Sequence, residues 1–169
     1  SGELGRIVHF ESHFDRHRPL VRARWREVAG PGSGLWYDLG PHLLDQTLQL
    51  FGWPRAITLD SAAMRDGAQT DDWFHAQLRY EGLRVTLHVS ALVAAADLRF
   101  ALHGTLGSYV KLGLDTQEDQ LKSGHRPGWP PAPDWGVDTA RSTVTVAQGE
   151  QLVSRDEPTA QKPQAKRQL

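Results

Sequence analysis

The sequence predicts an α+β domain, in which an open, mostly antiparallel β-sheet carries helices on one face. Two observations support this fold class. Short runs with alternating apolar and polar residues recur along the chain and are joined by tight turns, as in antiparallel sheets. One long amphipathic helix is expected, after a glycine-rich segment, and it would cover one face of the sheet while the other stays open.

Length and composition are those of one ordinary soluble domain. The chain has 169 residues, 39% of them hydrophobic, and a net charge of −1, which gives no electrostatic footprint for nucleic acid or an anionic membrane. No apolar run reaches the roughly 18 residues of a membrane-spanning helix. The absence of cysteine excludes disulfides and thiolate metal sites. We therefore expect a cytoplasmic protein with neither a nucleic-acid partner nor a membrane partner.

Alternating runs give the expected strands. The first lies at residues 6–15, where Val8, Phe10 and Phe14 point to one side and polar side chains point to the other. Further strand-like runs lie at 56–64, 72–80, 83–90, 98–103, 108–112 and 142–147. The polar faces of these runs carry a set of histidines, namely His9, His13, His75, His88 and His103. Such a face needs water, a partner subunit, or both.

The long helix is expected after the glycine-rich loop Gly30–Gly34. Proline is tolerated only in the first turn of a helix, so Pro41 predicts that this helix begins between Tyr37 and Pro41. It should end at Gly52, because a glycine followed by Pro54 is a typical helix stop.

The polar face of this helix is the candidate chemical site. Asp38, His42 and Asp45 fall within roughly 60° of one another on a helix. A carboxylate beside an imidazole fixes its tautomer and raises its basicity, which suits a general base acting on a hydroxyl proton. The same spacing also fits a solvated polar face, and two carboxylates with one imidazole could hold a divalent ion. On the residues alone, all three interpretations stay open.

The stretch GPGSGLWYDLGPHLLDQTLQLFGWP, from Gly30 to Pro54, resembles the signature that opens the second domain of the glucose–fructose oxidoreductase/inositol dehydrogenase/MocA family. The segment GELGRIVHFESHFDRHRP resembles the first strand of that domain. The segment LRFALHGTLGSYVKLGLDTQEDQL resembles the strand, turn and strand that follow in sugar-dehydrogenase-like members. Together these matches cover about residues 2–136.

The resemblance implies the dihydrodipicolinate-reductase-like C-terminal domain of a two-domain oxidoreductase. Residues 1–153 would form this substrate-binding and oligomerisation domain, and residues 154–169, which hold almost nothing apolar, would be a disordered tail. NAD or NADP would be bound mainly by an N-terminal Rossmann domain. No GxGxxG fingerprint follows a strand here, so we expect that domain to be absent and the isolated chain to be inactive.

The family acts on sugars, polyols or related hydroxyl compounds, which the resemblance therefore implies as substrates. Asp38 and His42 match the catalytic aspartate and histidine of the motif, and Asp45 matches its later aspartate, which we place among the substrate contacts. The open sheet face commonly forms the subunit interface in this family, so a homo-oligomer is expected.

Polarity and placement in loops or near them add four further substrate contacts to this site. They are Lys111, Arg16, Arg18 and Trp25. No metal ligand is assigned. Two alternatives remain, a non-catalytic oligomerisation or binding module and a metal-dependent lyase or isomerase that uses Asp38, His42 and Asp45.

Overall fold

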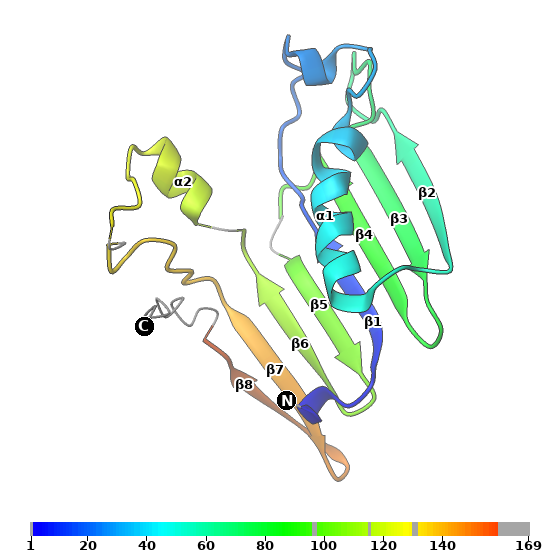
Figure 1. Cartoon of the computed structure of the whole chain (residues 1–169), viewed down its shortest axis with the longest axis vertical. Coiled ribbons are helices and arrows are strands. Elements are labelled where there is room, and N and C mark those ends of the chain that lie inside the picture. The colour runs from blue at the N-terminus through cyan, green and yellow to red at the C-terminus, as the bar shows by residue number, and fades with distance from the viewer. Residues whose placement is uncertain (1, 96–97, 115, 130–131, 159–169) are drawn as a thin grey trace, which may run out of the picture.

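A computed structural model describes residues 2–95, 98–114, 116–129 and 132–158. The strands are β1 (Ile7–His13), β2 (Ala56–Ala62), β3 (Trp73–Arg79), β4 (Arg84–Ser90), β5 (Leu98–Gly104), β6 (Gly107–Leu112), β7 (Ser142–Gln148) and β8 (Gln151–Asp156). They form one sheet of eight strands in the order β2-β3-β4-β1-β5-β6-β7-β8 (Figure 1). The helices are α1 (Leu35–Phe51) and α2 (Gln117–Lys122), with short 3₁₀ turns at Gly2–Leu4 and Trp25–Glu27. The predicted fold class is confirmed.

Strand β1 occupies the centre of the sheet. It pairs in parallel with β4, with His13 opposite His88, and antiparallel with β5. All the other pairs in the described sheet are antiparallel and join strands that are consecutive in the chain. The sheet is thus made of two local meanders, β2–β4 and β5–β8, with β1 between them (Figure 1).

The core lies between α1 and one face of the sheet. Leu39 and Leu43 of the helix pack against the apolar sides of the central strands, where Phe10, Phe74 and Leu87 are fully buried. Helix α1 contacts β3 and β4 and lies along that face (Figure 1). The period of two in each strand therefore sends the histidines to the opposite face, as the alternation predicts.

Helix α1 begins at Leu35, before the predicted window of Tyr37 to Pro41. The reason is a cap from a distant loop. The backbone N–H of Leu35 donates to the carbonyl of Asp71 (2.9 Å), and that of Trp36 donates to the Asp71 carboxylate (2.7 Å). Two of the amides that a helix start leaves unsatisfied are thereby paired. Pro41 consequently lies inside the helix.

Replacing Gly34 with alanine should destabilise this helix start. Gly34 has a φ of 96°, and a Cβ atom there would overlap the Asp71 carboxylate, so the cap must move. We expect a loss of about 1–3 kcal/mol in the free energy of unfolding, measured by urea denaturation. Gly32→Ala is the control, because Gly32 also has a positive φ but has nothing within 4 Å of the new Cβ. Equal losses in both variants would contradict the clash.

Strand β8 extends the sheet beyond the predicted end of the folded domain at residue 153. It pairs with β7 from Gln151 to Asp156, so the prediction of disorder from Ser154 is wrong for its first residues. Every side chain of β8 is exposed, so a prediction based on apolar residues does not detect this edge strand. The predicted tail from residue 159 onward lies outside the described residues. No helix in the described part of the chain is long and apolar enough to cross a membrane.

Candidate active site

A cavity of about 670 Å³ opens beside the N-terminal end of α1. Its walls come from the segment Arg16–Arg26, here called the arginine loop, from the first turn of α1, from the loop between β2 and β3, and from α2. The basic lining residues are Arg16, Arg18, Arg22, Arg24, Arg26, Arg65 and Lys122. The acidic ones are Glu27, Asp38, Asp71 and Glu118. Since the positive end of the α1 dipole also lies here, the cavity is electropositive.

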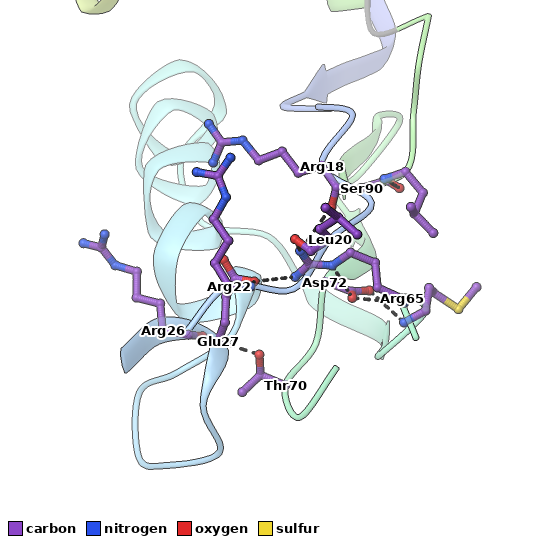
Figure 2. Close-up of polar contacts among 11 residues, drawn as sticks. Arg18, Leu20, Arg22, Arg26, Glu27, Arg65, Thr70, Asp72 and Ser90 are labelled. Carbon is purple, nitrogen blue, oxygen red and sulfur yellow. Dashed lines mark hydrogen bonds and ion pairs between the residues drawn. The ribbon is translucent and has the colours of Figure 1, made fainter. Parts of the chain in front are cut away.

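Arg65 holds the arginine loop in place (Figure 2). Its guanidinium donates to the backbone carbonyls of Arg18 and Leu20, at 3.2 Å each. The same group contacts the Glu27 carboxylate at 3.2 Å and donates to the Asp72 carboxylate at 2.8 Å. The side chains of Arg65 and Asp72 are only 6% and 1% exposed. A buried and fully partnered ion pair thus fixes the path of an otherwise irregular segment.

Three arginines of the loop keep their charge free for a ligand. In the described part of the chain, no carboxylate lies within ion-pair distance of Arg18, Arg22 or Arg24. Figure 2 shows the side chains of Arg18 and Arg22 both reaching toward α1. Arg16 contacts Glu118 at 3.6 Å, and its pKa is lowered by burial and by the neighbouring charge of Arg18. These guanidinium groups can donate hydrogen bonds to hydroxyl or anionic oxygens.

Asp38 is the residue of the helix motif that reaches this cavity. Arg26 Nε lies 2.9 Å from Asp38 Oδ1, and the Asp38 side chain keeps 30% of its surface exposed. The predicted contacts Arg16, Arg18 and Trp25 line the same cavity. The structure therefore brings four of the predicted site residues together.

The other predicted residues lie outside the cavity lining. His42 is exposed one turn further along α1, and Asp45 accepts a hydrogen bond from Gln49 (2.7 Å). Lys111 is buried on β6, where its ammonium contacts Asp138 at 2.6 Å.

The metal-binding interpretation of the helix motif is not supported. Among the described residues, the groups of His, Asp and Glu whose ligand atoms lie within 4.8 Å of one another do not include Asp38, His42 and Asp45. Both carboxylates of that trio are engaged by other side chains instead, Asp38 by Arg26 and Asp45 by Gln49. The trio therefore leaves no cluster of ligand atoms for an ion.

Sequence reasoning missed several residues of the cavity. Arg22, Arg24 and Arg26 recur at every second position of the arginine loop, and this density of cations was an available signal. The contribution of Arg65 and Asp71 carried no such signal, because it depends on a loop that follows a later strand.

Comparison with known proteins gives relatives that are consistently oxidoreductases. The chain is 55% identical over 152 residues to the oxidoreductase YdgJ of Escherichia coli (strain K12), which covers 90% of this chain and 43% of YdgJ. It is 42% identical over 137 residues to scyllo-inositol 2-dehydrogenase (NADP(+)) IolW of Bacillus subtilis (strain 168), covering 81% of this chain and 37% of IolW. The chain thus spans about two fifths of the length of the curated relatives it matches.

Comparison with solved structures also gives oxidoreductases. The oxidoreductase YPO2259 from Yersinia pestis superposes with a TM-score of 0.84 at 50% identity, covering 92% of this chain and 43% of that one. The family model described as the GFO/IDH/MocA C-terminal domain matches residues 1–110. The chain therefore belongs to the GFO/IDH/MocA oxidoreductase family, as a C-terminal domain of that family.

Proposed function

We propose that this chain is the substrate-binding domain of an NAD(P)-dependent oxidoreductase that acts on a sugar, a polyol or a related hydroxyl compound. The observation that carries the proposal is the position of Asp38, on the wall of the arginine-lined cavity at the start of α1. The name of the Bacillus subtilis relative supports a polyol substrate and a nicotinamide cofactor. The volume of the cavity, about 670 Å³, is ample for a six-carbon polyol.

For oxidation of a hydroxyl compound, this domain must hold the hydroxyl-bearing carbon and take up the hydroxyl proton. Arg18 and Arg22 offer guanidinium donors for the substrate hydroxyls. The carboxylate of Asp38, held by Arg26, accepts a hydrogen bond from a further hydroxyl and so orients the substrate. His42 lies one turn along α1, outside the cavity lining, so its imidazole would be the acid or base for a reacting hydroxyl on the part of the substrate that extends from the cavity along α1. The nicotinamide, when bound, would accept or donate the hydride.

The cofactor would be held mainly by a Rossmann domain that pairs with this one. The exposed His42 fits this arrangement, because a second domain docked over α1 would cover the imidazole and bring the cofactor beside it. The sheet face opposite α1 would form a homo-oligomer interface, and the enzyme would be cytoplasmic.

The proposal is tested by nicotinamide absorbance with a panel of polyols and sugars. The two-domain protein, in which this domain is joined to its cofactor domain, should reduce NAD or NADP with at least one of these substrates. The 169-residue chain alone should give no turnover. In NMR titrations of the chain, the active polyol should shift the resonances of Trp25 and Asp38 but leave those of β8 unchanged. Absence of turnover by the two-domain protein, or clear turnover by the chain alone, would contradict the proposal.

A further inference from the structure

A second cluster of chemical groups lies on the sheet face opposite α1, away from the cavity. His13 ends β1, Asp15 follows it, and His88 lies opposite His13 on the neighbouring strand β4. The backbone beyond β1 continues this pairing, since Phe14 N–H donates to the His88 carbonyl (3.0 Å) and Arg16 N–H donates to the Ser90 carbonyl (2.9 Å). The cluster is therefore built on two hydrogen-bonded strands, which hold side chains more accurately than a free loop does.

The distances within the cluster match those between ligands of one metal ion. His13 Nδ1 lies 3.2 Å from Asp15 Oδ2, and His88 Nε2 lies 3.6 Å from Asp15 Oδ1. The three residues offer ligand atoms that all lie within 4.8 Å of one another. Two ligands at about 2.0–2.1 Å from a tetrahedral ion are about 3.4 Å apart, so the two distances between Asp15 and the imidazoles already suit one ion.

The carboxylate of Asp15 is not satisfied by the protein. Asp15 is only 8% exposed, and its Oδ1 atom is buried without a hydrogen-bond partner. Unpaired buried polar atoms are rare in folded proteins and call for an explanation such as a missing ion or water. Here the unpaired carboxylate oxygen is directed toward an imidazole, which is itself a common metal ligand.

Glu11 supplies the partner that metal-bound histidines usually have. His13 Nε2 lies 3.0 Å from Glu11 Oε2, on the side of the ring opposite the nitrogen that faces Asp15. A carboxylate in this position fixes the tautomer with Nδ1 free to ligate and increases its basicity. The chain thus provides both the ligand atoms and the group that orients one of them.

We propose that His13, Asp15 and His88 form a binding site for a divalent transition-metal ion such as Zn²⁺. Two imidazoles and one carboxylate are a donor set that suits Zn²⁺, Co²⁺ and Fe²⁺ better than Mg²⁺ or Ca²⁺. Three protein ligands leave a coordination position for water or for another ligand. The ion would fix Asp15 to β4 at the point where the arginine loop begins.

The test is a calorimetric titration of the chelator-treated chain with Zn²⁺, which measures binding without any turnover and so does not depend on the proposed function. We expect one equivalent to bind and to raise the melting temperature. Loss of a hydrogen-bonding partner of a metal ligand typically weakens metal binding by about 10–100-fold. His88→Gln and Asp15→Asn remove ligands themselves and should each weaken binding by more than that. Glu11→Gln should fall within that range.

His75→Gln is the matched control. His75 is an exposed histidine on the same face, paired in register with His88, and it does not belong to the ligand group. Its replacement should leave the affinity unchanged, whereas a loss equal to that of His88→Gln would overturn the site. If Asp15→Asn unfolds, Co²⁺ added to the unaltered chain decides, because it must shift the ring resonances of His13 and His88. Failure of the unaltered chain to bind Zn²⁺ or Co²⁺ would also overturn it.

Discussion

Replacement of Asp72 by alanine is expected to lower the free energy of unfolding by about 3–5 kcal/mol, the usual cost of removing one partner of a buried ion pair. The carboxylate accepts hydrogen bonds from the backbone amides of Met64 (2.7 Å) and Arg65 (3.1 Å) as well as from the Arg65 side chain. Its loss leaves the buried guanidinium with only the Glu27 carboxylate as a counter-charge, and two backbone amides without an acceptor. Urea denaturation measures the change.

Asp66→Ala is the control for this prediction. Asp66 is an exposed carboxylate of the same loop, so its removal should change stability by no more than about 0.5 kcal/mol. Because Arg65 also holds the carbonyls of Arg18 and Leu20, the Asp72 variant should lose ligand binding in the cavity under conditions where it is still folded. Similar stabilities for the two variants would show that the ion pair is not the anchor of the arginine loop.

Replacement of His42 by alanine in the two-domain enzyme should lower kcat by about 10²-fold or more, if the imidazole transfers the hydroxyl proton. Affinity for the cofactor should stay nearly unchanged, because in the proposed enzyme the cofactor is held mainly by the other domain. Steady-state kinetics with saturating cofactor give both values. The stability of the variant should also be nearly unchanged, since His42 is exposed.

Gln49→Ala serves as the matched control on the same helix face. Gln49 is exposed two turns further along α1, where it donates to Asp45. Its removal should leave kcat within a factor of about 2, as expected for a surface residue far from the reacting atoms. An unchanged kcat in the His42 variant would assign that histidine to a solvated polar face instead.

Most of the sheet could be predicted from local pattern, because the alternation of apolar and polar residues along a strand depends only on which face of the strand is buried. The faces of β3 and β4 follow directly from Phe74, Leu78, Val85 and Leu87. The start of α1 could not be predicted in this way, since its cap is Asp71, which follows in the chain only after α1 itself and β2. Strand β8 could not be predicted either, because an exposed edge strand needs no apolar face.

The candidate site could also be predicted only in part. Asp38 follows from the helix motif, whereas the role proposed for His42 rests on the resemblance to the family motif. Lys111 shows the limit of arguing from polarity. Its charge is neutralised by Asp138, which lies in a distant segment that no local pattern connects to β6. The cavity is likewise formed by segments that only the fold brings together, so only part of its lining could be predicted.

The central position of β1 has a kinetic consequence for how this domain forms. Strands β6 and β7 are joined through residues 113–141, which include α2, but the other strand pairs are hairpins with shorter loops, which close quickly and at low entropic cost within the two meanders. Joining the two requires β1 to insert between them, and its contact between His9 and Arg84 links residues 75 positions apart. Such long-range pairing must be reached before it contributes any stability, which slows folding. Insertion of β1 is therefore the expected rate-limiting step, and until it occurs the unpaired backbone edges of β4 and β5 stay open to other chains.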